Sequence, residues 1–192
     1  MLRRAIVRAG VVVLTATFSV SVLAFDAGAA TKAVTPAIWL TDVCKAYSQM
    51  TKAVDTAGNT GQLAYANANQ SDGAALQAIF QTRFQTQDQA VAVALVAVKK
   101  AGTPAIANGK QLAAAATANL TEFHTNLQKA LQQVAAVASN PSTASQLYAT
   151  AYPTNPPTPG SLLQALVKAN KAFSNAALSG RGAVYKATTT CS

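Results

Sequence analysis

The feature that most constrains the fold is a seven-residue repeat of apolar and small side chains between residues 103 and 139. Two positions of each heptad carry it through five heptads: Ile106, Ala113, Leu120, Leu127 and Val134, and, three residues after each, Gly109, Ala116, Phe123, Ala130 and Val137. This spacing is typical of a long helix packed against other helices. Thr103-Pro104 predicts the N-cap and first residue of that helix, and Asn140-Pro141 predicts its end.

An earlier amphipathic segment predicts a first helix. It starts at Thr35-Pro36, and its apolar side chains then follow at intervals of three and four residues. Gly58 is expected to end this helix, because Gly58-Asn59-Thr60-Gly61 is typical of a flexible turn.

A second helix is expected between these two. Asp72 is its predicted N-cap, and Gly102 fits the C-terminal end. Asp88 interrupts its apolar series, where position 87 or 88 should be apolar. Because Gly102 directly precedes Thr103, the second and third helices are expected to form an antiparallel hairpin.

The C-terminal part predicts one further long helix and a shorter helical segment. The shorter one carries Leu147, Tyr148 and Tyr152, and a stiff Pro-rich connector follows over residues 153–159. Thr158-Pro159 then starts the last amphipathic helix. The sequence therefore predicts an all-α fold, an antiparallel bundle of four main helices plus a short fifth helical segment.

The N-terminal residues 1–29 are expected to be a signal peptide. Arg3, Arg4 and Arg8 form a basic start, a mostly apolar stretch follows, and Ala27-Gly28-Ala29 is an A-x-A cleavage pattern. Cleavage would leave a single helical domain, residues 30–192, secreted or held in the extracytoplasmic cell envelope. Retention of the segment as a membrane anchor is the alternative. The abundance of alanine beside few acidic residues points to a bacterium with a GC-rich genome.

Both cysteines of the chain, Cys44 and Cys191, lie in the part expected to be exported. An even number of cysteines in an exported chain favours a disulfide, so the sequence predicts a single Cys44–Cys191 bridge. It would tie the C-terminal tail to the first helix.

The charge of the chain bears on its partners. Loss of three arginines and Asp26 with the signal peptide would lower the net charge from +9 to +7. The remaining basic residues are scattered rather than gathered in a stripe with interleaved aromatics, which argues against a nucleic-acid partner. A cationic surface in an envelope favours encounters with an anionic polymer or lipid head groups, and another protein is a further candidate partner.

The sequence offers little for catalysis. Beyond residue 29 the groups for acid–base work are few: Asp42, Asp55, Asp72, Asp88, Glu122 and a single histidine, His124. Their spacing brings no two carboxylates together on one helix, and zinc and di-iron ligand sets are missing. We therefore expect a non-enzymatic protein without a metal site or resident cofactor. An enzyme whose site carries no recognisable motif is the least favoured hypothesis.

His124 is the single weak candidate for cofactor binding. It follows Phe123 at the edge of the heptad face, where a histidine satisfied by solvent or a neighbour is the simplest interpretation. The alternative is an axial haem ligand, opposite a tyrosine. The tyrosines considered for that role are Tyr47, Tyr65, Tyr148 and Tyr152.

The alanine-rich helix faces leave two functional hypotheses. Small side chains favour tight packing between helices, but helices of unequal length can also leave an apolar pocket. The leading hypothesis is an exported interaction module that uses an exposed bundle face or the Pro-rich connector. The alternative is a carrier that holds an apolar small molecule, lipid-like or haem, between helices.

Overall fold

The computed structural model describes residues 33–137, 146–147 and 156–169. Its elements are β1 (Ala33–Val34), α1 (Pro36–Asn67), α2 (Gly73–Lys100), β2 (Thr103–Pro104), α3 (Gly109–Ala136) and α5 (Pro159–Ala169). The two short strands pair in parallel, with Ala33 opposite Thr103 and Val34 opposite Pro104. The described chain is thus predominantly helical, and the all-α prediction is confirmed.

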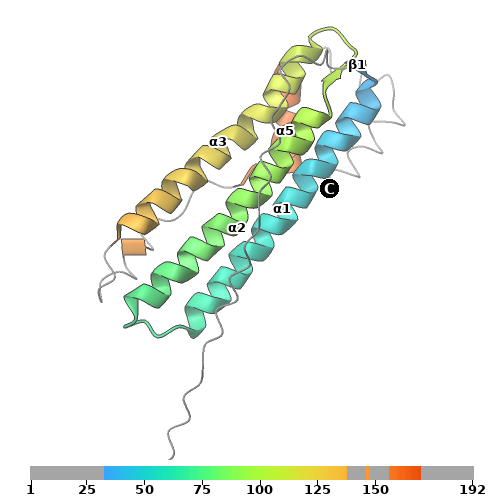
Figure 1. Cartoon of the computed structure of the whole chain (residues 1–192). Coiled ribbons are helices and arrows are strands. Elements are labelled where there is room, and N and C mark those ends of the chain that lie inside the picture. Colours follow the sequence, from blue (N-terminus) through green and yellow to red (C-terminus); the bar gives the residue numbers. More distant parts are fainter. Residues whose placement is uncertain (1–32, 138–145, 148–155, 170–192) are drawn as a thin grey trace, which may run out of the picture. The chain divides into compact units, whose positions relative to one another are not determined.

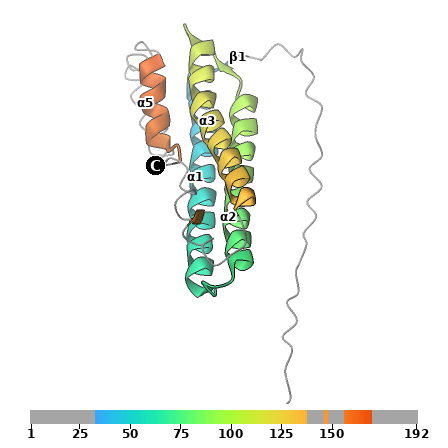
Figure 2. The same cartoon turned by 90° about the vertical axis from the view of Figure 1, so that its left-hand side faces the viewer.

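The helices form a bundle (Figure 1). Consecutive helices α1, α2 and α3 run antiparallel, with α2 packed against both α1 and α3. Helix α5 packs against α3 and also contacts α1 (Figure 2). The side chains between the helices form one apolar core, whose largest fully buried members include Trp39, Tyr47, Phe84, Leu112 and Leu162.

Three predicted helix starts are confirmed. Helix α1 begins at Pro36 after Thr35. The Asp72 carboxylate accepts a hydrogen bond of 3.0 Å from the Ala75 amide and so caps α2. At α5, the Thr158 and Ser161 side chains each accept a hydrogen bond from the other residue's backbone amide. These local interactions involve residues three apart, which explains why sequence patterns could locate them.

The predicted end of the first helix at Gly58 is wrong. Helix α1 continues without a break through the Gly58–Gly61 segment to Asn67. Gly61 is buried under Arg83 of α2, and a Cβ built on Gly61 would lie only 2.8 Å from Arg83 Cδ. Gly61 therefore provides the room that a neighbouring helix needs, and does not mark a turn.

The predicted start of the third helix at Thr103 is also wrong. Thr103 and Pro104 form β2, and the amide of Ala105 donates a 2.8 Å hydrogen bond to the Val34 carbonyl. Helix α3 starts only at Gly109, after Asn108 with a positive φ of 61°. Ile106 is consequently outside the helix. Of the later heptad positions, Ala113 and Val137 are half-buried and the others are buried as expected. The segment after Gly102 pairs with Ala33–Val34, which is distant in sequence, and this pairing explains why the local helix-start pattern at Thr103 was misleading.

Several predictions concern residues outside those that the structure describes. They are the signal peptide over residues 1–29, the Asn140-Pro141 stop, Tyr148, Tyr152 and Cys191. Of the short fifth helical segment, Gln146 and Leu147 are described; both are helical, and Leu147 is buried. Within the described ranges, no helix combines the length and apolar character required to span a bilayer.

Candidate functional site

Small side chains face one another where α1 and α2 pack. On α1, Ala53, Ala57 and Gly61 are spaced four residues apart, and on α2 Ala78, Thr82 and Thr86 have the same spacing. Residues four apart lie on one face of a helix. Side chains this short leave space above the line of contact between the two helices.

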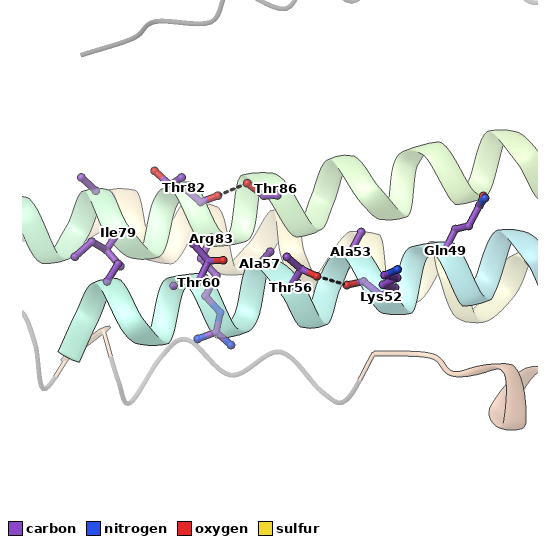
Figure 3. A pocket seen from close by; sticks show the side chains of 13 residues that line it. Gln49, Lys52, Ala53, Thr56, Ala57, Thr60, Ile79, Thr82, Arg83 and Thr86 are labelled. Carbon is purple, nitrogen blue, oxygen red and sulfur yellow. Dashed lines mark hydrogen bonds between the residues drawn. The ribbon is translucent and has the colours of Figure 1, made fainter. Parts of the chain in front are cut away.

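That space consists of two adjoining hollows, which we together call the α1–α2 groove. The larger hollow has a volume of about 710 Å³ and is lined by Gln49, Lys52, Ala53, Thr56, Ala57, Thr60, Gly61, Ala64, Ala78, Ile79, Thr82, Arg83 and Thr86 (Figure 3). The smaller has about 330 Å³ and is lined by Ala46, Gln49, Met50, Ala53, Thr86, Gln89, Ala90, Val93, Ala94 and Ala97. Both volumes fall within or near the range of about 300–1,000 Å³ that is typical of ligand pockets.

Two lining threonines use their hydroxyl groups within their own helices. Thr56 Oγ1 donates to the Lys52 carbonyl at 2.8 Å, and Thr86 Oγ1 donates to the Thr82 carbonyl at 2.9 Å, as the dashed lines in Figure 3 show. These hydroxyl donors are already satisfied by the backbone. The groove surface is therefore more apolar than its threonine content suggests.

The charged residues of the groove are both cationic. Lys52 on α1 is exposed, and Arg83 on α2 lies with its aliphatic stem against Gly61. The Arg83 guanidinium lies 5.7 Å from the centre of the Phe84 ring. Neither hollow is lined by an aspartate or glutamate. An anionic group in the larger hollow would thus meet the Lys52 ammonium without carboxylate repulsion.

A second polar arrangement joins α2 to α3. His124 Nδ1 lies 2.8 Å from Asp88 Oδ1, and Gln128 Nε2 donates a hydrogen bond to Asp88 Oδ2. Burial raises the pKa of Asp88, although the charge of His124 and the two side-chain hydrogen bonds oppose that increase. Asp88 thus lies within ion-pair distance of His124. Axial haem ligation by His124 stays a prediction.

The tyrosines considered as partners of His124 are placed elsewhere or lie outside the described residues. Tyr47 is wholly buried, and its hydroxyl donates a 2.7 Å hydrogen bond to the Ala116 carbonyl. Burial raises the pKa of Tyr47 far above its ordinary value, which keeps the phenol protonated. Tyr65 packs edge-on against Phe80.

The described residues contain no group of three or more His, Cys, Asp or Glu side chains that could hold a metal ion. Cys44 is fully buried in the core face of α1, whereas Cys191 lies outside the described residues. The predicted bridge between them is therefore carried forward as a proposal.

The sequence predicted the cofactor candidate His124 but not its link to Asp88. The available signals were the interruption of the apolar series at Asp88 and the position of His124 beside the heptad face. To connect Asp88 with His124, one must know which residues of α2 and α3 lie opposite each other, and the sequence does not show this. The abundance of alanine was the one sequence feature that pointed to the groove, and no sequence feature pointed to Arg83. Comparison with protein-family models, curated proteins and solved structures found no match to this chain.

Proposed function

We propose that this chain is an exported, non-enzymatic binding protein of the cell envelope or extracellular space, and that the α1–α2 groove is its working surface. The observation that carries the proposal is the groove itself, a long hollow between two helices whose lining is small and mostly apolar. Its lining contains no histidine, cysteine or carboxylate that could act in acid–base or nucleophilic catalysis. This composition supports binding rather than chemistry.

Export and processing are tested together by the intact mass of the protein recovered from its host. The proposal predicts a chain of residues 30–192 in the envelope or medium, two hydrogens lighter than the reduced form because of a Cys44–Cys191 disulfide. The complete burial of Cys44 supports its use as a protected anchor point. Recovery of the whole chain from the cytoplasm, with both thiols alkylated without prior reduction, would refute export and the bridge together.

The second candidate function is carriage of an apolar small molecule, and the volume of the larger hollow favours it. Native mass spectrometry of protein purified from its own host distinguishes the two. A retained small molecule supports a carrier, whereas an empty chain supports an interaction module that binds another macromolecule.

Binding at the groove can also be tested with N-phenyl-1-naphthylamine, a neutral apolar dye that fluoresces when water is excluded from it. The mature chain should increase the dye's fluorescence saturably. Placing a carboxylate in the apolar part of the groove, as in Val93→Asp, should abolish that increase. Val96→Asp is the matched control, since Val96 is also exposed on α2 but is not among the lining residues. Loss of dye binding in both variants, or in neither, would argue against the groove.

A further inference from the structure

The two hollows of the α1–α2 groove differ in charge. The larger hollow is lined by the cationic Lys52 and by the stem of Arg83, whose guanidinium lies toward Gly58 and the Phe84 ring, whereas the smaller hollow has no charged residue among those that line it. The hollows share Gln49, Ala53 and Thr86, so one continuous path leads from the cationic part to the uncharged part. A ligand that fits both parts is itself divided into an anionic end and an apolar end.

The uncharged part also explains an exposed apolar side chain. Val93 is 70% exposed although it lies on a helix whose other face is in the core. A single exposed apolar side chain is ordinary on a protein surface, but Val93 also borders a hollow that apolar groups can fill. Val93 forms one wall of the smaller hollow, with Ala46 and Met50 of α1 on the other side. A chain of methylene groups lying there would cover Val93 and remove it from water.

The length of the uncharged part suits one extended alkyl chain. On α2 it runs from Thr86 to Ala97, and the eleven steps between these two residues rise by about 16 Å at the usual helix pitch. Two helices bound this trough, and its volume of about 330 Å³ is less than half that of the larger hollow. A single chain is better matched to this trough than the paired chains of a membrane phospholipid.

From these observations we propose that the α1–α2 groove binds a single-chain anionic amphiphile of the fatty-acid class. Its carboxylate lies in the larger hollow beside the Lys52 ammonium. Its alkyl chain runs past Ala53 and Thr86 along Val93 toward Ala97. The inference rests on the proposed carrier function and adds the class of ligand and its direction in the groove.

The experiment compares three probes that share a twelve-carbon chain: laurate, dodecyl maltoside and dodecyltrimethylammonium. Each is titrated into the mature chain, residues 30–192, by calorimetry at concentrations below its micelle threshold. Laurate should bind most tightly, the neutral maltoside more weakly and the cationic probe most weakly. Added salt should weaken laurate binding and leave maltoside binding nearly unchanged, because only the former depends on charge.

Two pairs of variants assign the two ends of the ligand. Lys52→Gln should weaken laurate binding about tenfold, the effect of losing one charge-assisted contact, and leave maltoside binding unchanged. Lys45→Gln is its control, because Lys45 is exposed on the same helix but lines neither hollow. Val93→Asp should abolish binding of laurate and maltoside alike, whereas Val96→Asp should preserve both.

The outcomes separate the two proposals. Equal binding of all three probes, a preference for the cationic probe, or a Lys52→Gln variant that binds laurate normally would overturn the anionic amphiphile while leaving a carrier of apolar molecules intact. If neither these probes nor N-phenyl-1-naphthylamine binds the folded chain, the ligand class and the carrier function both fail. Circular dichroism of each variant confirms that the helices are retained.

Discussion

At the scale of single residues, two glycines in one helix provide a controlled comparison. Gly61 is buried under Arg83, and an added Cβ would lie 2.8 Å from Arg83 Cδ and 3.1 Å from Arg83 Cβ. Three residues earlier, an added Cβ on Gly58 would lie 3.8 Å from its nearest neighbours, which is ordinary contact. The same substitution therefore meets different surroundings.

Gly58→Ala should stabilise the chain by about 0.5–1 kcal/mol, because alanine restricts the unfolded state and favours the helix. Gly61→Ala should lose that gain and destabilise the chain by about 1–3 kcal/mol, because α2 or the Arg83 stem must move away. Urea unfolding of both variants measures the difference. Equal free energies of unfolding would contradict the close approach of Arg83 to Gly61.

Asp88 gives a pH dependence of defined sign. Burial raises its pKa above the ordinary value of 3.8, so the folded chain binds the proton more tightly than the unfolded chain. The contribution of Asp88 to stability is therefore most favourable below pH 3.8. It declines as the pH rises from 3.8 through the raised pKa.

The comparison with Asp88→Asn isolates that contribution. The free energy of unfolding of the wild-type chain, relative to Asp88→Asn, should fall as the pH is raised from about 3 to 7. A wild-type advantage that instead grows with pH would mean that pairing with His124 outweighs burial.

At the scale of elements, Asp72 tests whether the start of α2 depends on a local side-chain cap. Its carboxylate is the recorded side-chain cap of that helix, with a 3.0 Å hydrogen bond to the Ala75 amide. Asp72→Ala should cost about 1 kcal/mol of stability and increase amide hydrogen exchange in the first turn of α2. Exchange in α5, which has its own Thr158 and Ser161 cap, should not change. Uniform loss of protection through α2 and α5 would contradict a local cap.

The same elements show what a sequence can predict. Helix starts at Pro36, Gly73 and Pro159 could be predicted because the cap residue and the first turn lie within three or four positions of each other. The sequence wrongly predicted a helix end at Gly58 and a helix start at Thr103. In the first case the glycine-containing segment packs against Arg83 of α2, and in the second case Thr103 pairs with Ala33. Both partners are distant in sequence, and local propensity does not contain them.

The candidate sites follow the same rule. His124 was identified as a residue of interest, but its neighbour Asp88 comes from another helix and needs the packing register of α2 on α3. Likewise the groove arises only when the alanines of α1 face the small side chains of α2. Arg83, the α2 side chain that packs against Gly61, had no distinctive sequence context at all.

At the scale of the whole molecule, the proposed Cys44–Cys191 disulfide would close a loop of about 148 residues and stabilise the folded chain by up to about 5 kcal/mol in the chain-entropy model. Thermal unfolding of residues 30–192, with and without reductant, should show a large decrease in melting temperature on reduction. The double variant Cys44→Ala with Cys191→Ala should melt at the reduced temperature and be insensitive to reductant. An unchanged melting temperature on reduction would contradict the bridge.

The central claim is that the face between α1 and α2 is where this molecule binds its ligand. Nitrogen–proton correlation spectra of the mature chain, recorded while laurate is added below its micelle threshold, test it residue by residue. We expect saturable changes in amide chemical shift that cluster between Ala46 and Ala64 on α1 and between Ala78 and Ala97 on α2, with no changes along the exposed face of α3. Shifts spread evenly over all helices, or confined to the surroundings of His124, would contradict it.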